Sequence, residues 1–224
     1  MKIQVITLFP EMFGPVLSTS MLRKAQEKKL AGFELINLRN FGLGPRKTVD
    51  DTPFGGGAGM VLKPEPIFAA AAAAKKAKPK SQVIVMTPSG QPYSQKTAES
   101  LAKQSGLILI CGHYEGFDER ILSLADMQLS IGDYVLTGGE IAAMVIIDSV
   151  VRLLPGVLGS QDSTADETFS NGLLEYPQYT RPEKFRDMEV PAVLKSGNHA
   201  AIAKWRRQQS IKKTKQIRPD LLGK

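Results

Sequence analysis

A length of 224 residues allows one or two domains with a sizeable core, and the formal net charge is +7. No apolar run approaches a membrane span, and the first residues lack a basic region followed by an apolar one, so we expect a cytoplasmic protein with no membrane partner. The single cysteine, Cys111, excludes an internal disulfide and lies in an apolar strand pattern, which favours a buried structural thiol over a nucleophile.

Strand and helix patterns alternate over the first 154 residues. Alternating or continuous apolar runs predict strands, and helical spacing or runs of helix formers predict helices. The predicted strands are residues 2–8, 33–38, 82–86, 107–111 and 127–131, and the predicted helices are residues 18–30, 64–78, 94–104 and 139–154, with a further short helix after Gly112. This order is typical of an α/β domain with a mostly parallel sheet.

The helix predicted over residues 139–154 is apolar on most sides and is stopped by Pro155 and Gly156. Such a helix is expected to be buried on more than one face. A dimer interface is a natural explanation, and a central core helix would have the same pattern.

Residues 39–59 carry charges of both signs and no regular pattern. A segment of this length in a compact domain is usually functional or disordered. Because the flanking elements are well patterned, we favour a functional lid or substrate loop. Four glycines within residues 55–59 would allow the backbone to approach a ligand closely.

Three predicted strands end in glycine turns, at residues 87–90, at Gly112 and at residues 132–139, and the last two loops carry the acids Glu115 and Asp133. Ligands of open α/β sheets bind outside the carboxyl ends of the strands, so three such turns favour a ligand site over ordinary connections. Neither the dinucleotide fingerprint nor the P-loop pattern occurs, which argues against a nicotinamide oxidoreductase and a P-loop NTPase.

The C-terminal part differs in composition from the rest. We assign residues 1–159 to the first domain, residues 160–172 to a polar linker and residues 173–224 to a small, mostly helical second domain. A helix is predicted from Asn198, with Ala201, Ile202 and Trp205 on its apolar side and Lys204 and Arg207 opposite. Nine of the 29 Lys and Arg lie in the last 30 residues, against one acid there. This segment is either a polyanion-binding surface, which we favour, or a solvated tail.

Several strings go beyond composition: CGHYEGFDER, SIGDYVLTGGE, PGVLG, DETFSNGLLE and YPQYTRP. In this order, over nearly the whole chain, they resemble the TrmD-type tRNA (guanine-N1-)-methyltransferases. The resemblance implies a SPOUT fold with a deep trefoil knot and a homodimer whose site is shared between subunits. It also implies methyl transfer from S-adenosyl-L-methionine to N1 of guanosine 37 of tRNA. Family members are reported to need Mg²⁺, for which the sequence shows no clear ligand cluster.

The resemblance also implies residue roles. Cofactor binding would fall to Thr87, Pro88, Gly112, Glu115, Ile131, Gly132, Asp133, Tyr134, Val135, Leu136, Gly138 and Gly139. The family's arginine before PGVLG maps onto Arg152, which would stabilise charge on guanine O6. The family's general base is a linker aspartate, but Glu167 holds that position here, and its neighbour Asp166 is the alternative.

The resemblance extends to tRNA contacts. The basic segment 195–224 and the loop around Arg46 and Lys47 would bind the tRNA backbone, and Tyr114 and residues 50–59 are candidates for a guanine pocket. Because residues 160–170 have almost no apolar side chains to bury, we expect this segment to lack order without tRNA. Two rival hypotheses remain: an RNA-binding protein that has lost catalysis, and a SPOUT methyltransferase acting on rRNA or at another tRNA position.

Overall fold

The computed structural model describes residues 1–158, 167–169 and 172–222. The chain divides into two compact units, Met1–Gly159 and Ser160–Lys224. Most of the segment expected to be a linker lies outside the described residues, so its order stays a prediction.

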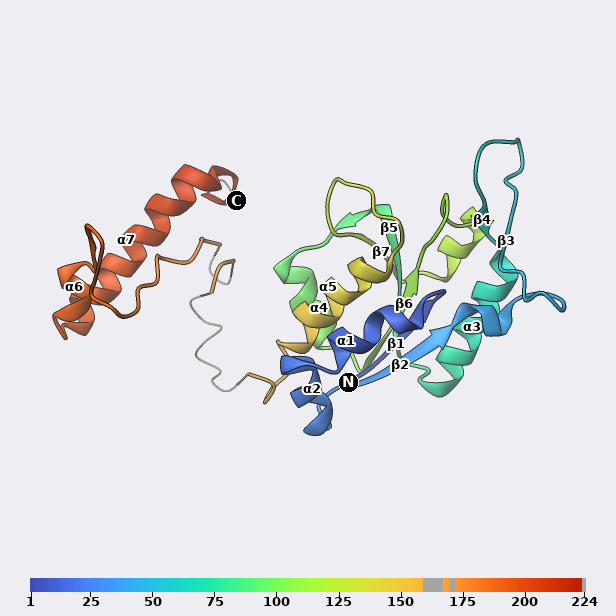
Figure 1. The fold of residues 1–224 in the computed structure, drawn as a ribbon, viewed down its shortest axis with the longest axis horizontal. Coiled ribbons are helices and arrows are strands. Elements are labelled where there is room, and N and C mark those ends of the chain that lie inside the picture. Colours follow the sequence, from blue (N-terminus) through green and yellow to red (C-terminus); the bar gives the residue numbers. More distant parts are fainter. Residues whose placement is uncertain (159–166, 170–171, 223–224) are drawn as a thin grey trace. The chain divides into compact units, whose positions relative to one another are not determined.

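The first unit is built on one five-stranded parallel sheet (Figure 1). Its strand order is β2 (Gly32–Asn37), β1 (Lys2–Thr7), β6 (Gly106–Cys111), β5 (Gln82–Pro92) and β7 (Met127–Ser130). Every residue of β6 is buried, as expected for a central strand covered on both faces. The predicted α/β fold with a parallel sheet is confirmed.

Helices cover both faces of the sheet. One face packs against α1 (Gly14–Leu17), α2 (Ser20–Glu27), α4 (Gln95–Ala102) and α5 (Glu140–Val151), and the other packs against α3 (Pro64–Ala77). In α3 a proline occupies the first turn, and Ile67, Ala70 and Ala74 form its buried stripe at helical spacing. The short helix after Gly112 is a 3₁₀ helix, Glu119–Leu124.

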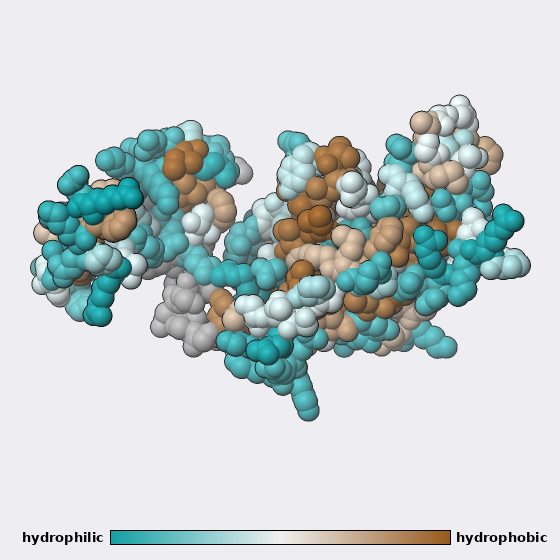
Figure 2. All heavy atoms as spheres, viewed as in Figure 1, coloured by the Kyte–Doolittle hydropathy of each residue, from teal (hydrophilic) through white to brown (hydrophobic). Residues whose placement is uncertain are grey.

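The helix α5 is buried on more than one side, but part of its surface is open. Ala143, Ile146, Ile147 and Val150 are buried, whereas Ile141 and Val145 are exposed. Figure 2 shows hydrophobic side chains gathered over α5 and the loop before it. The burial expected from its composition is confirmed, and the exposed apolar face leaves a surface available to a partner.

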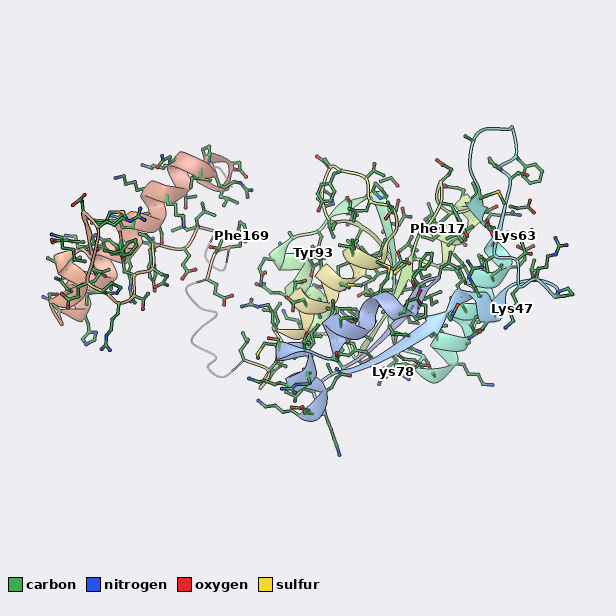
Figure 3. All side chains as sticks on the ribbon, viewed as in Figure 1. Lys47, Lys63, Lys78, Tyr93, Phe117 and Phe169 are labelled. Carbon is green, nitrogen blue, oxygen red and sulfur yellow. The ribbon has the colours of Figure 1, made fainter. Side chains whose placement is uncertain are left out.

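The segment 39–59 is more regular than its sequence suggested. The strands β3 (Asp50–Asp51) and β4 (Val61–Leu62) pair antiparallel, and a bridge between Leu43 and Thr48 closes a tight turn before them. The Lys63 ammonium donates to Asp51 Oδ2 at 3.1 Å across this pairing, and Figure 3 shows Lys47 and Lys63 in this part of the unit. The prediction of a patternless loop was therefore wrong outside residues 52–60.

Two predicted boundaries are wrong for local reasons. The helix predicted over residues 18–30 is shorter in the structure, where α2 spans only Ser20–Glu27. It ends early because Lys29 adopts a φ of 58°, and Leu30 N then donates to Ala25 O. The TPSG turn at residues 87–90 is a bulge inside β5: both Met86 and Gln91 pair with Leu129, so four residues loop out. A Cβ at Gly90 would lie 2.6 Å from Leu129 N, so only glycine fits there.

The second unit is small and mostly helical in its described part. It contains the hairpin β8 (Lys184–Phe185) and β9 (Met188–Glu189), then α6 (Ala192–Lys195), α7 (His199–Ile217) and a 3₁₀ helix (Pro219–Leu222). Asn198 Oδ1 accepts from Ala201 N and caps α7, as its sequence predicts. Ala201, Ile202 and Trp205 are half-buried while Lys204 and Arg207 are exposed, which confirms the predicted faces of this helix.

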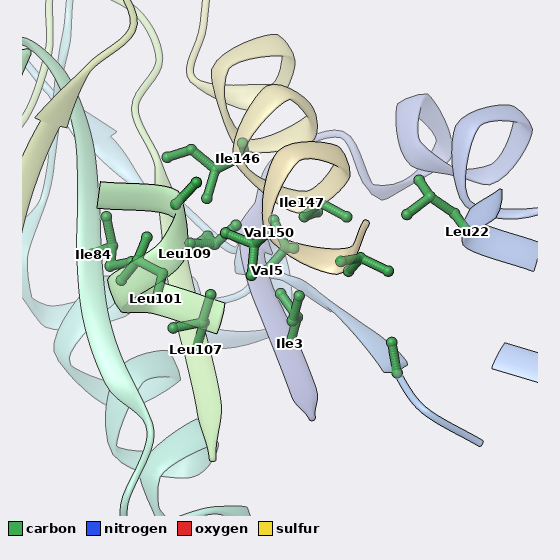
Figure 4. Close-up of a cluster of buried hydrophobic side chains, with 14 of the residues drawn as sticks. Ile3, Val5, Leu22, Ile84, Leu101, Leu107, Leu109, Ile146, Ile147 and Val150 are labelled. Carbon is green, nitrogen blue, oxygen red and sulfur yellow. The ribbon is translucent and has the colours of Figure 1, made fainter. Parts of the chain in front are cut away.

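The core of the sheet face that carries α5 is dense. Figure 4 shows Leu109 of β6 among Val5, Ile84 and the α5 side chains Ile146 and Val150. All five side chains are fully buried. Burying them stabilises the sheet and fixes the position of α5 on it.

We expect Leu109→Ala to lower the free energy of unfolding by about 2–5 kcal/mol, since the cavity it leaves cannot collapse at a strand centre. Urea denaturation followed by circular dichroism measures this. Leu43→Ala, the same change at an exposed position, should cost within about 0.5 kcal/mol. Equal losses in the two variants would contradict the assigned core.

Candidate functional site

A cavity of about 190 Å³ lies at the carboxyl ends of three neighbouring strands, β6, β5 and β7. Its walls come from the loop after β6, the bulge of β5 and the loop after β7. Because β5 lies between β6 and β7 in the sheet, these three segments meet although they are distant in the sequence. We call this cavity the strand-end cleft.

The structure brings most of the predicted cofactor residues together. Lining the strand-end cleft are Thr87, Pro88, Gly112, Glu115, Ile131, Gly132, Tyr134, Val135, Leu136, Gly138 and Gly139. Asp133 is exposed and is not among the lining residues. In the loop after β7, the residues before and after Asp133 therefore line the cleft, but Asp133 itself does not.

The remaining predicted residues lie elsewhere. Arg152 caps the C-terminal end of α5 and does not line the strand-end cleft, whereas Gly139, just before the N-terminus of α5, does. The 12 residues of α5 separate them by about 18 Å. Glu167 belongs to the second unit, and Asp166 lies outside the described residues. One chain's cleft therefore does not contain its own Arg152.

The loop after β7 closes the cleft by touching the backbone of β6. Gly139 N donates to Gly112 O at 2.8 Å. A Cβ at Gly139 would lie 2.8 Å from Gly112 N and 2.9 Å from Cys111 Cα, which are backbone atoms that cannot move aside cheaply. Since the φ of Gly139 is −80°, this glycine is required for space rather than for conformation.

A buried polar group behind this contact was missed by sequence reasoning. Glu140 is 2% exposed, and Thr7 Oγ1 donates to its Oε1 at 2.7 Å. As the first residue of α5, the carboxylate lies at the positive end of the helix dipole. Nothing in the local pattern around Glu140 marked it as buried, because its partner Thr7 is 133 residues away.

His113 is the second missed residue. It lines the strand-end cleft, and its ring lies 4.8 Å from that of Phe9. Its Nδ1 is buried and has no hydrogen-bond partner in the described part of the chain. A Cβ at Gly138 would overlap Glu140 Oε2 and lie 2.9 Å from His113 Nδ1, so both side chains lie against that glycine. The string CGHYEG could have indicated this histidine.

Cys111 is buried beside the same group, which agrees with its expected structural role. Burial raises the pKa of its thiol well above the ordinary value, and the nearby charge of Glu140 raises that pKa further. The thiol therefore stays protonated and is a poor nucleophile.

The lining of the strand-end cleft suits a ligand with a flat apolar part. Aliphatic and aromatic side chains such as Leu129, Phe117 and Tyr134 form its walls, while glycines expose backbone polar groups. Glu115 supplies a carboxylate that can pair with a positive charge on the ligand. These groups are suited to binding a ligand rather than to attacking it as nucleophiles.

The second unit has a cavity of its own, about 240 Å³ in volume. It is lined by Glu167, Leu173, Leu174, Tyr176, His199, Ile202, Ala203, Arg206, Arg207 and Ser210. The Arg206 guanidinium lies 4.7 Å from the centre of the Tyr176 ring, a cation–π contact that fixes its plane. Glu167, which the sequence analysis predicts to be the general base, thus lies among basic and aromatic groups.

The described residues offer no metal centre, because no three His, Cys, Asp or Glu side chains among them come together as one would require. Within the same part of the chain, no helix combines the length and the apolar character needed to cross a membrane.

The fold and the strand-end cleft define an α/β protein with a ligand-sized cavity at the carboxyl ends of its parallel strands. A family model described as tRNA (Guanine-1)-methyltransferase TrmD matches residues 1–224. The chain therefore belongs to the TrmD family of tRNA (guanine-1)-methyltransferases.

Curated relatives agree with this assignment. The chain is similar to a tRNA (guanine-N(1)-)-methyltransferase of Geobacillus kaustophilus, with 59% identity over 99% of this chain and 91% of the relative. It is also 59% identical to the enzyme so named in Brevibacillus brevis, over 100% of this chain and 92% of the relative. A third, from Dictyoglomus turgidum, is 55% identical over 100% and 91% of the two chains.

We expect Gly139→Ala to destabilise the first unit by about 1–3 kcal/mol, since its methyl group must push two backbone segments apart. Urea denaturation measures the loss. Gly14→Ala is the matched control, because nothing lies within 4 Å of a Cβ there and its helical backbone accepts alanine. Equal stability of the Gly139 variant and the wild-type chain would show that the loop after β7 does not close on β6.

Proposed function

We propose that this chain transfers a methyl group from S-adenosylmethionine to N1 of guanosine 37 in tRNA. The observation that carries the proposal is the strand-end cleft, where residues of the strings CGHYEG and SIGDYVLTGGE lie side by side. The chain belongs to a family of tRNA methyltransferases, which names the ligand that such a cleft would bind. Three strands would contribute to one binding site for the methyl donor.

The cleft fits this donor in shape and charge. Close packing of Gly138 and Gly139 against residues 111–113 and Glu140 leaves no room for a side chain at either position and holds the loop after β7 at the cleft. Apolar walls suit an adenine ring, and the Glu115 carboxylate suits the donor's positive charge. When bound, the donor supplies a methyl group already activated by a sulfonium ion.

The protein's own residues would supply proton removal and charge stabilisation. Guanine N1 carries a proton at neutral pH, and a positioned carboxylate must accept it as N1 attacks, which contributes about 10²–10⁴-fold. Negative charge then grows on guanine O6, where the Arg152 guanidinium would stabilise it.

Glu167 is our choice for the base, with Asp166 as the alternative. Glu167 occupies the position of the family's aspartate, and its extra methylene displaces the carboxylate by about 1 Å, a change that can cost about 10²-fold unless the backbone compensates. The segment that carries Glu167 would have to adjust when tRNA binds.

A homodimer would complete the site. Arg152 lies about 18 Å from the strand-end cleft of its own chain, at the far end of α5. The exposed Ile141 and Val145 on α5, with Val135 in the adjacent loop, form an apolar surface that a second copy can cover. Packing two copies through α5 would allow Arg152 of one chain to serve the cleft of the other. We also propose that the chain of the first unit is threaded as a deep trefoil knot.

We assign tRNA backbone binding to the basic residues of the second unit. Lys204, Arg207, Lys212 and Lys215 are exposed along α7 and would contact phosphates, with Arg46 and Lys47 of the first unit adding to them. The protein would act in the cytoplasm, where tRNA is modified. Mg²⁺ has no fitting ligand group among the described residues, so no step is routed through it.

We expect Glu167→Gln to slow methyl transfer by about 10²-fold or more, because an amide cannot accept the N1 proton. Single-turnover transfer from labelled S-adenosylmethionine to a tRNA transcript with guanosines at positions 36 and 37 measures this. Asp166→Asn is the matched control and should retain the wild-type rate. The reverse pattern would assign the base to Asp166. Binding of donor and tRNA without transfer by the wild-type chain would favour an RNA-binding protein.

Mixed dimers test the shared site. We expect Arg152→Ala and Gly139→Ala to be impaired alone, the first in charge stabilisation and the second in donor binding. Refolded together, they should regain activity, because the intact cleft of the Arg152 variant meets the intact Arg152 of the other chain. If mixing restores no activity while mixed dimers form, Arg152 acts within its own chain.

A further inference from the structure

Phe54 is an aromatic side chain that the first unit leaves bare. It is 103% exposed, more than any other large hydrophobic residue in the described part of the chain. It lies in the loop of residues 52–60 between β3 and β4, which we call the hairpin loop. A phenylalanine ring presents two flat apolar faces and no polar group, so full exposure leaves both faces to water.

The hairpin loop is built so that nothing covers the ring. Gly55, Gly56, Gly57 and Gly59 have φ values of 86°, 80°, 127° and 83°, a region that side-chain-bearing residues rarely adopt. No Cβ at Gly55 or Gly56 would meet any atom within 4 Å. The glycines next to the ring therefore contribute no packing partner, and they allow the positive-φ backbone path on which the ring stays exposed.

The base of the hairpin loop is firmly held. Asp50 and Asp51 pair with Leu62 and Val61, and the Lys63 ammonium bonds to Asp51. At the tip, Gly56 N donates to Pro53 O and closes a turn that includes Phe54. The ring thus stands on a defined turn above a paired stem.

The same stem is attached to the rim of the strand-end cleft. Glu115 N donates to Met60 O at 3.0 Å, and Leu62 N donates to Gly116 O at 2.9 Å. A Cβ at Gly59 would overlap the side chain of Glu115, which lines the cleft. The hairpin loop that carries Phe54 is therefore anchored, at its foot, to a segment that lines the cleft.

The turn before the stem carries positive charges that suit a nucleic acid. Arg46 and Lys47 are exposed on the turn that precedes β3, and Figure 3 shows Lys47 there with Lys63 at the end of β4. Because Lys63 is paired with Asp51, Arg46 and Lys47 are the cations that can contact phosphates while an aromatic ring stacks on a base, which is how proteins hold unpaired nucleotides. An apolar protein partner would not need them.

We propose that Phe54 is a stacking platform for an unpaired base of the tRNA loop, next to the guanosine that is methylated. This inference rests on the proposed function and adds a contact that holds the neighbouring nucleotide. Stacking of one base on an aromatic side chain corresponds to about 5- to 150-fold in affinity. The platform positions the substrate and takes no part in the chemistry.

Three variants separate stacking from other contacts. Phe54→Tyr keeps the aromatic face, Phe54→Leu keeps apolar bulk without it, and Phe54→Ala removes both. The Kd for tRNA is measured by fluorescence anisotropy at several salt concentrations, and S-adenosylmethionine binding is measured by calorimetry. We expect Leu and Ala to weaken tRNA binding about tenfold or more and Tyr to remain within about twofold. The slope of affinity against salt should stay unchanged, since no phosphate contact is lost, whereas Lys47→Ala should reduce it.

A base-specific readout locates the contact. With 2-aminopurine in place of the nucleotide on either side of the target guanosine, binding of the wild-type chain should alter its fluorescence at one position, and Phe54→Leu should abolish that change. Wild-type affinity in all three variants would overturn the proposal, as would equal affinity of the Leu and wild-type chains. A change from dimer to monomer in Phe54→Ala would overturn the proposal too, because it would show that the ring packs against a second copy of the chain instead. If the wild-type chain binds no tRNA, the proposed function itself fails.

Discussion

The close passage of Gly139 over the backbone of Gly112 and Cys111 is the constraint on which the rest of the first unit depends. After β7, at the edge of the sheet, the chain must return to the sheet centre so that α5 can pack against β1 and β6. The return path crosses the carboxyl end of β6 so closely that no side chain fits at residue 139. This crossing makes the loop after β7 one wall of the strand-end cleft.

The same crossing fixes the direction of α5. Its N-terminus lies at the cleft, with the buried Glu140 carboxylate held by Thr7, and its C-terminus carries Arg152 to the far end. The N-terminal end of α5 therefore lies at the cleft, and its C-terminal end lies away from it. In the function we propose, one helix would thus bind the donor in its own chain and stabilise charge in another, which makes dimer formation a requirement for catalysis.

Glycines serve two distinct physical purposes in this molecule. At Gly90 and Gly139 the φ is not positive, and glycine is needed because a neighbouring backbone occupies the space of a Cβ. At residues 55–57 the φ values are positive and the surroundings of Gly55 and Gly56 are empty, so glycine is needed for conformation. The first kind closes the cleft, and the second allows the turn on which Phe54 is exposed. A count of glycines in the sequence does not distinguish them.

The sequence by itself determined the elements whose causes are local. Continuous apolar runs marked β6 and its neighbours, Asn198 marked the start of α7, and the long motif strings marked the family and most of the cleft lining. Those features depend on residues within a few positions of one another, so their patterns are visible in the chain.

Only the tertiary structure decided the features that depend on distant neighbours. The strand order placed β6, β5 and β7 side by side, turned Thr87–Gly90 into a bulge against Leu129, and left Asp133 outside the cleft. It also buried Glu140 against Thr7 and put Arg152 about 18 Å from the cleft. Helical and strand periodicities report the face on which a side chain lies, but not which strand or helix that face meets, so these contacts could not be read from the sequence.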